Sequence, residues 1–249
     1  MEINIYNTPH QLGEAAGIAA AALIRNAINK NGTANIVLAT GASQFGTLSQ
    51  LITEPGIDWS KVVIFHLDEY INLPLTHPAS FRRYLVERFL SKVPPLKAAF
   101  LINGETDAAA ECDRISMLIS QHPIDVALVG IGENGHLAFN DPPADFETEK
   151  PYIIVELDDH CRKQQLGEGW FRSFEEVPRL AISMSIKQIL RSKDIICSVP
   201  DKRKARAVKN CLQQPVDTRY PASILQQHPA CTIYLDESSS ALLSKDNII

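Results

Sequence analysis

Residues 124–141 read IDVALVGIGENGHLAFND, and the first six of them form a short, nearly continuous apolar run. A run of this length is typical of a strand buried in a sheet. Gly130, Gly132 and Gly135 follow it, and glycine permits backbone paths and close ligand approach that a side chain would obstruct. His136 comes next, and an imidazole can give or take a proton near neutral pH. The segment therefore predicts a catalytic loop after a buried strand in an α/β enzyme.

Composition places few limits on function but excludes some partners. The chain has 249 residues, of which 45% are hydrophobic and 21% charged, and its formal net charge is -5. This length allows a sizeable core. The only dense basic cluster, KRKAR at 202–206, is too short for a polynucleotide footprint but suits a small phosphate. We therefore expect no nucleic-acid partner.

The chain start and the cysteines bear on the cellular compartment. The N-terminal residues MEINIY lack the basic and apolar regions of a signal peptide, and no apolar run approaches a membrane span. We expect a cytoplasmic protein without a membrane partner. The five cysteines are odd in number and widely spaced, which favours reduced, mostly buried thiols. No His, Cys and Asp set has the spacing of metal ligands, so no metal site is expected.

Apolar strands alternate with helical patterns along the whole chain. This alternation predicts an α/β fold with a mostly parallel, doubly wound sheet covered on both faces. Because no repeat or linker composition interrupts it, we expect one domain over 1–249. The expected strands are 35–39, 62–66, 98–101, 124–129, 152–156, 180–184, 194–199 and 231–235. The expected helices are 9–30, one from 44, 80–91, 107–121, 158–166, 186–190, 202–211 and 238–243.

Three polar loops come directly after predicted strands, at 40–43, 67–70 and 130–141. In an open parallel sheet, ligands bind beyond the carboxyl ends of the strands. If these three strands are parallel neighbours, their loops share one edge of the sheet. Three separately weak motifs would then form a single candidate site.

The first loop offers hydroxyl groups and a glycine at the start of a helix. The hydroxyl groups of Thr40, Ser43 and Thr47 and the amide of Gly41 together suit a phosphate group, which helix N-termini attract. A purely structural turn is the commoner role of such a sequence. It is not a Walker loop, because no Gly-Lys-Ser/Thr follows.

The second loop supplies Asp68 and Glu69 after a buried strand. In the structural alternative, Asp68 caps a turn and Glu69 pairs with a surface cation. In the functional one, the carboxylate at the strand end is a general base, particularly if partial burial raises its pKa.

The third loop carries the strongest signal. A lone histidine is usually a satisfied core residue, but Gly132 and Gly135 beside His136, with Asp141 close behind, favour a catalytic role. Asp141 either begins a turn before Pro142 or accepts a hydrogen bond from the imidazole and fixes its tautomer.

These motifs together resemble the glucosamine-6-phosphate deaminase (isomerase) family, which is grouped with 6-phosphogluconolactonases in a Rossmann-like superfamily. The resemblance runs from Asn35 to about Asp236. Lactonases typically have Asp-Glu-Arg in the second motif and lack Ala-Phe-Asn after the histidine, so the chain is similar to the deaminase branch. The fold implied is a Rossmann-like three-layer sandwich. The most specific motifs are Leu67-Asp68-Glu69-Tyr70, His77-Pro78-x-Ser80-Phe81 and the glycine-rich histidine loop that continues into Ala138-Phe139-Asn140.

The resemblance also implies roles for individual residues. Asp68 matches the base that moves a proton between C2 and C1 of the opened sugar, and His136 matches the ring-opening catalyst. Asp141 falls where the family usually has a Glu that orients the histidine. The segment Thr40-Gly41-Ala42-Ser43-Gln44 matches the phosphate loop, and Lys204 matches a lysine that contacts the phosphate. We count Gly135 with the substrate-binding residues.

Two departures from the family pattern concern the catalytic loop. Asn134, which we include in the catalytic set, stands where many deaminases have Asp. An amide cannot neutralise an imidazolium, so the charge pair would depend on Asp141 alone, and Asp141 is one methylene shorter than Glu. Arg162 and Arg172 both lie near the place of the family's phosphate-binding arginine, and the alignment gives neither directly.

The implied reaction is the isomerising deamination of an amino-sugar phosphate, glucosamine 6-phosphate to fructose 6-phosphate plus ammonia, without a metal or redox cofactor. Three alternatives remain: the galactosamine epimer as substrate, 6-phosphogluconolactonase activity, and a non-catalytic sugar-phosphate-binding regulator, which only Asn134 favours. The expected partner is the small-molecule substrate. The sequence leaves a homo-oligomer open, because nothing in it defines a subunit interface.

Overall fold

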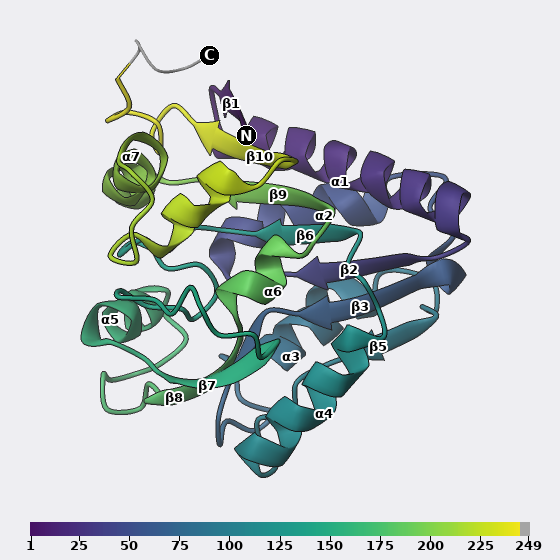
Figure 1. Cartoon of the computed structure of the whole chain (residues 1–249), viewed down its shortest axis with the longest axis horizontal. Helices are drawn as coiled ribbons and strands as arrows, with labels where there is room; N and C mark the ends of the chain where they lie inside the picture. The colour runs from purple at the N-terminus through teal and green to yellow at the C-terminus, as the bar shows by residue number, and fades with distance from the viewer. Residues whose placement is uncertain (245–249) are drawn as a thin grey trace.

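A seven-stranded sheet, parallel throughout, forms the centre of the computed structural model, which describes residues 1–244 (Figure 1). Its strand order is β1-β10-β9-β6-β2-β3-β5. The predicted mostly parallel α/β fold is confirmed, and the last residues of the predicted domain, 245–249, lie outside the described part. The strands are β1 Glu2–Tyr6, β2 Ala34–Leu38, β3 Val62–His66, β5 Ala98–Phe100, β6 Val126–Val129, β9 Asp194–Val199 and β10 Cys231–Asp236.

The strand order reverses between β2 and β6 in the middle of this sheet. β3 and β5 continue the sheet on the β2 side, whereas β9, β10 and β1 continue it on the β6 side. Every residue of β2, β3 and β6 is buried, which explains why these strands read as uninterrupted apolar runs. Such a reversal opens a crevice at the carboxyl ends of the strands.

Helices cover both faces of the sheet. The helices α1 (Pro9–Asn31) and α2 (Phe45–Thr53) pack on one face, where a Cβ on Gly13 would lie only 2.7 Å from the backbone of Gly46. The two helices can therefore approach this closely only because both positions are glycine. The other face is covered by α4 (Ala108–Ser120), α6 (Ile186–Leu190) and α7 (Ala205–Gln213).

Local signals set the ends of α1 as the sequence predicts. The side chain of Thr8 accepts a hydrogen bond from the Gln11 N–H, Pro9 is the first helical residue, and Gly32 ends the helix with φ of +75°.

A second, antiparallel sheet lies beside the main one, and it contains two strands that were predicted with the correct bounds but in the wrong sheet. Its order is β4 (Asp68–Tyr70), β8 (Leu180–Met184), β7 (Tyr152–Glu156). We expected the first of these as a loop and the other two in the parallel sheet. After β3 the chain passes Leu67 and pairs with β8, with Asp68 opposite Ser183. This pairing is non-local, so the pattern of the isolated segments does not reveal it.

Three further segments differ from expectation. The edge strand β1 was not predicted. The expected helix at 238–243 is wrong, because Asp236 Oδ1 accepts from the Ser238 hydroxyl at 2.8 Å and the Ser239 N–H at 2.6 Å and stabilises turns instead. The helix expected at 80–91 is α3 (Phe81–Leu85), capped by Ser80, followed by a π-helical turn η3 (Val86–Leu90).

The remaining helical elements are short. They are α5 (Asp159–Gly167) and the 3-10 turns η1 (Ala42–Gln44), η2 (Trp59–Lys61), η4 (Lys202–Lys204) and η5 (Pro221–Gln227). All five cysteines are buried and free. No helix within 1–244 is long and apolar enough to cross a membrane.

Candidate functional site

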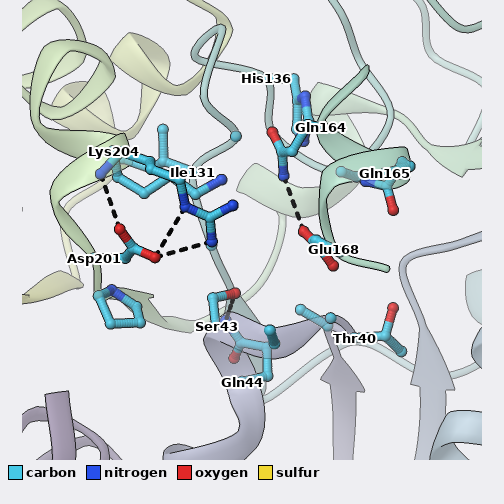
Figure 2. Close-up of a pocket in the computed structure, with 18 of the residues that line it drawn as sticks. Thr40, Ser43, Gln44, Ile131, His136, Gln164, Gln165, Glu168, Asp201 and Lys204 are labelled. Carbon is cyan, nitrogen blue, oxygen red and sulfur yellow. Dashed lines mark hydrogen bonds and ion pairs between the residues drawn. The ribbon is translucent and has the colours of Figure 1, made fainter. Parts of the chain in front are cut away.

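The three polar loops leave the same edge of the parallel sheet. β2 pairs in parallel with both β3 and β6, so the chains following these strands emerge side by side. A cavity of about 490 Å³ opens there (Figure 2). Asp68 and His136 both line it, as do residues 40–44 and Lys204. The structure thus brings a carboxyl group, an imidazole, a hydroxyl-rich turn and a lysine to one cavity.

Hydrogen bonds with neighbouring elements fix the turn after β2. Gly41 adopts φ of +91°, a conformation that side chains disfavour, and its carbonyl accepts from the Tyr84 hydroxyl at 3.2 Å. The buried Gln44 amide donates to the carbonyls of Val129 and Ser198 at 3.3 and 3.4 Å. Gln44 therefore ties the turn to the ends of β6 and β9. The residues of η1, which directly precedes α2, line the cavity, an arrangement that suits an anion.

Lys204 faces this turn from another element. In Figure 2 it lies with Asp201 on one side of the cavity, opposite Gln165 and Glu168. Its side chain is buried, and burial lowers the pKa of Lys204, while Glu133 and Glu168 act in the opposite direction. The neighbouring Arg203, by contrast, is half exposed and already paired with Asp201 at 2.9 Å.

Asp68 is the buried carboxyl group at the floor of the site. It begins β4, and only 7% of its surface is exposed. Burial and, second, the adjacent carboxylate of Glu69 raise the pKa of Asp68 to about 8. When ionised, such a group takes up a proton more readily than an ordinary aspartate, which is the property a general base needs.

Glu69 has a structural role, but its side chain does not pair with a surface cation as the structural alternative predicted. Its side chain is fully buried and accepts from the backbone N–H groups of Tyr70, Phe81 and Arg82 at 2.9, 3.2 and 2.9 Å, and from the Ser80 hydroxyl at 2.9 Å. The carboxylate therefore holds the start of α3. The motifs 67–70 and 77–81 are parts of one hydrogen-bonded unit.

His136 is held between a glycine and a carboxylate. Its Nδ1 lies 3.2 Å from Oδ1 of Asp141, at ion-pair distance but without the alignment of a good hydrogen bond. Burial would raise the pKa of Asp141, but His136, Asn134 and the Asp158 N–H outweigh it, so the pKa is lowered. Asp141 is thus an ionised group that can orient the imidazole.

Asn134 and Gly135 do not line the main cavity, and neither does Asp141. The Asn134 amide donates to Asp141 at 2.9 Å and to Asp158 at 3.3 Å, and its carbonyl accepts from the His136 N–H at 3.1 Å. An aspartate at 134 would instead place a third carboxylate beside these two. Gly135, with φ of +89°, turns the chain behind the imidazole.

Neither of the two candidate arginines lines the cavity. The Arg162 guanidinium donates to the carbonyls of Phe174 and Val177 at 2.8 and 3.0 Å, and it stacks on the Phe174 ring. It therefore braces the segment after α5 and is not directed at a ligand. Arg172 is exposed, and its N–H donates to Glu176.

Three polar residues that were not predicted from the sequence line the cavity on α5 and at its end, namely Gln164, Gln165 and Glu168. A Cβ on Gly41 would lie 3.7 Å from Glu168 Oε2, so this carboxylate stands close to the proposed phosphate turn. No predicted strand ends at these positions. The weak signals were the two adjacent glutamines and the glycines at 167 and 169 that flank Glu168. Gln165 is buried and accepts from the Tyr70 hydroxyl at 2.8 Å.

Known proteins resemble this chain in both sequence and structure. Residues 7–234 match the family described as glucosamine-6-phosphate isomerases/6-phosphogluconolactonase. The glucosamine-6-phosphate deaminase of Listeria monocytogenes serotype 4a is 37% identical over 89% of this chain and 92% of its own length. That of Lactobacillus delbrueckii subsp. bulgaricus is 34% identical over 98% and 100%.

Solved structures give the same picture of the fold. That of a monomeric glucosamine-6-phosphate deaminase has a TM-score of 0.88 and 30% identity, covering 97% of this chain and all of its own. The 6-phosphogluconolactonase of Trypanosoma brucei has a TM-score of 0.79 and covers 98% of each chain. Its identity is only 16%, so the likeness extends to the fold alone.

Proposed function

The chain belongs to the family of glucosamine-6-phosphate isomerases and 6-phosphogluconolactonases, and from that premise we propose that it converts glucosamine 6-phosphate and water to fructose 6-phosphate and ammonia. One observation carries the proposal: Asp68, with its raised pKa, and His136, with its ionised partner, open onto the same cavity as an anion-binding turn. A base, a proton shuttle and a phosphate anchor are what this reaction requires.

The phosphate of the substrate binds to residues 40–44 and to Lys204. Contacts at this remote end hold the sugar while the other end reacts, so binding energy contributes to positioning. His136 then carries a proton from the anomeric hydroxyl to the ring oxygen and opens the ring. Asp141 keeps the imidazole in one tautomer and stabilises it when it is protonated, and Asn134 holds Asp141 in place.

Asp68 carries out the isomerisation of the open chain. It removes the proton from C2 and delivers it to C1, while a proton of the C2 ammonium group passes to the C1 oxygen. An iminium group at C2 and a hydroxyl group at C1 result. Water adds to C2, and ammonia leaves as the ketone forms. The closest alternative substrate is the galactosamine epimer, which differs only at C4.

Product analysis tests the proposal directly. Incubation with glucosamine 6-phosphate is expected to release ammonia and fructose 6-phosphate in equal amounts. Parallel incubations use galactosamine 6-phosphate and 6-phosphogluconolactone. If only galactosamine 6-phosphate releases ammonia, the substrate is the galactosamine epimer. Lactone hydrolysis, or binding without ammonia release, would overturn the deaminase assignment.

A single variant tests the proposed base. Asp68→Asn removes the proton-accepting group but keeps the size of the side chain, so turnover is expected to fall by about 10²–10⁴-fold. Substrate affinity, measured by calorimetry on the inactive variant, should remain. The matched control is Asp113→Asn, at an exposed position on α4 outside the cavity. Near-normal turnover in Asp68→Asn would remove this residue from the mechanism.

A further inference from the structure

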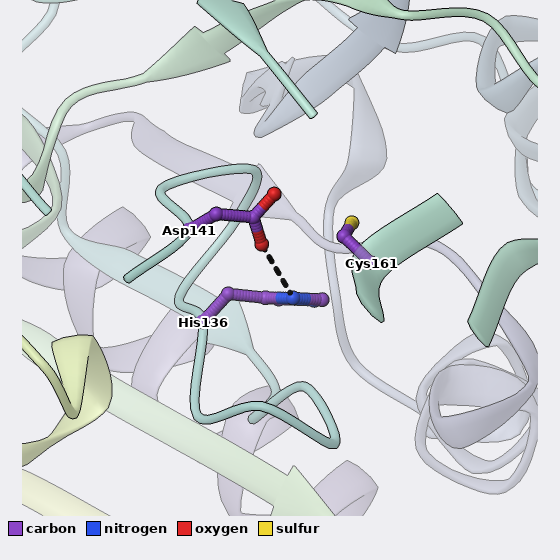
Figure 3. Close-up of side chains that lie close together, drawn as sticks. All are labelled: His136, Asp141 and Cys161. Carbon is purple, nitrogen blue, oxygen red and sulfur yellow. Dashed lines mark ion pairs between the residues drawn. The ribbon is translucent and has the colours of Figure 1, made fainter. Parts of the chain in front are cut away.

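The thiol of Cys161 lies behind the catalytic imidazole and has no part in the proposed reaction. Cys161 is in the first turn of α5, and only 1% of its surface is exposed. One ligand atom from each of His136, Asp141 and Cys161 can be chosen so that all three lie within 4.8 Å of one another. Figure 3 shows the three side chains converging on a common space. Imidazole, carboxylate and thiolate are the three ligand types that zinc binds in proteins.

The separations are close to those of a zinc site. Bonds of 2.0–2.3 Å in a tetrahedral centre give distances of about 3.3–3.7 Å between ligand atoms. Nδ1 of His136 and Oδ1 of Asp141 are already 3.2 Å apart. One ligand atom from each of the three residues lies within 4.8 Å of the others, so a shift of about an ångström brings such a set to tetrahedral separations.

The imidazole provides an independent indication of a ligand. Nδ1 of His136 is buried and has no aligned hydrogen-bond partner, and only 8% of the residue is exposed. A cation between His136 and Asp141 would satisfy this nitrogen. The carboxylate is already oriented by neighbours, because Asn134 donates to its Oδ1 and the Asp158 N–H donates to its Oδ2, both at 2.9 Å. Outer contacts of this kind orient the ligands of metal sites.

The thiol is placed for a metal and poorly suited to be a nucleophile. The Cys161 N–H donates to Asp158 Oδ1 at 2.6 Å, which fixes the first turn of α5. Burial, followed by the carboxylates of Asp141 and Asp158, raises the pKa of Cys161, so the free thiol keeps its proton. A bound metal ion displaces that proton.

We propose that His136, Asp141 and Cys161 bind one zinc ion, with the fourth position left to water. The thiol proton leaves to solvent as the sulfur–zinc bond forms, and nothing is oxidised or reduced. The bound ion occupies Nδ1 of His136 and ties α5 to the histidine loop. Zinc at this site is therefore an inhibitor that removes the imidazole–carboxylate pair from catalysis. The binding itself does not depend on the proposed reaction.

Zinc binding is measured on the metal-free full-length protein without substrate, by competition with a chromophoric chelator. One zinc ion per chain is expected. Cys161→Ser should weaken binding at least tenfold, whereas Cys112→Ser, at a buried cysteine on α4, should leave it unchanged. Absence of stoichiometric binding, or equal affinity in Cys161→Ser, would overturn the proposal.

A second measurement needs only the unaltered protein, so it holds even if the variant fails to fold. Cobalt(II) in place of zinc should give a thiolate-to-cobalt charge-transfer band in the near-ultraviolet. A cobalt complex without this band excludes Cys161 as a ligand. In the turnover assay, equimolar zinc should abolish ammonia release and excess chelator should restore it. Full turnover by the zinc-loaded protein would contradict the inhibitory role and leave the proposed reaction unaffected.

Discussion

A Cβ atom on Gly132 would lie 2.3 Å from Cε1 and Nε2 of the His136 ring, closer than non-bonded atoms approach. Gly132 is not among the glycines with positive φ in the described chain, so its backbone does not require glycine. The imidazole does. Glycine at 132 lets the backbone pack directly against the His136 ring and holds the ring beside Asp141.

Gly132→Ala is therefore expected to displace the imidazole from Asp141 and to lower kcat by about 10²-fold, because misplacement of about an ångström has costs of this size. KM should change little, since the proposed phosphate-binding turn is untouched. The control is Gly167→Ala, where the added methyl group meets nothing within 4 Å. A kcat for folded Gly132→Ala equal to that of the control would mean that the ring position is unimportant.

The rate should depend on pH in a way that reflects the buried base. Asp68 must be ionised to accept a proton, and its pKa is raised to about 8. We expect kcat/KM to rise with pH until about 8, well above the range of an ordinary aspartate. The substrate amine is titrated separately as a control. An acidic limb that is complete below pH 6 would contradict this assignment.

Protein stability should follow the opposite trend. In the folded state Asp68 keeps its proton up to about pH 8, whereas in the unfolded chain it ionises near its ordinary pKa of 3.8. The folded state thus binds more protons between these values, and stability falls as pH rises, by at most about 1.4 kcal/mol per pH unit. The Asp68→Asn variant has no titratable group at this position, so it does not lose stability in this way as pH rises.

The difference in Tm between Asp68→Asn and the unaltered protein should therefore shift in favour of the variant from pH 4 to pH 8 and then level off. Thermal unfolding across this range checks the slope, and a constant difference would show that Asp68 ionises normally.

Lys204→Met should raise KM at least about tenfold with a smaller effect on kcat. The methionine keeps the apolar stem packed but loses the buried charge that lines the same cavity as the proposed anion-binding turn. Inhibition by inorganic phosphate should weaken in parallel. Lys209→Met on α7, outside the cavity, is the control. Unchanged phosphate inhibition would exclude Lys204 as the anchor.

Glu168→Gln should have the reverse effect. The carboxylate of Glu168 stands close to Gly41, where its charge repels a phosphate. Its neutral replacement is expected to lower KM and tighten phosphate inhibition about three- to tenfold at low salt. Glu175→Gln, exposed on the same segment, serves as control. If KM rises instead, Glu168 contacts the substrate and favours its binding.

The sequence was informative wherever a structural requirement is local. The N-cap at Thr8, the glycine after α1 and the buried strands β2, β3 and β6 each depend on neighbouring residues, and each was predicted close to its observed bounds. The glycines of the histidine loop likewise pointed to a crowded site.

Contacts between residues far apart in the chain could not be predicted from local sequence patterns. Glu69 looked like a surface residue because its partners on α3 lie eleven to thirteen positions away. For the same reason β7 and β8 were assigned to the wrong sheet and β4 was expected as a loop. Cys161 has no neighbouring sequence feature that indicates a site, and the glycines on either side of Glu168 do not reveal that its carboxylate reaches the cavity.

The sequence by itself determined the buried central strands of the parallel sheet and that Asp68 and His136 follow two of them, because steric demands and hydrophobic periodicity act over a few residues. Only the tertiary structure decided how deeply Asp68 is buried, which carboxylate holds the imidazole and which thiol stands behind it. Burial and electrostatic interactions depend on distances in space, and folding sets those distances between residues far apart in the chain.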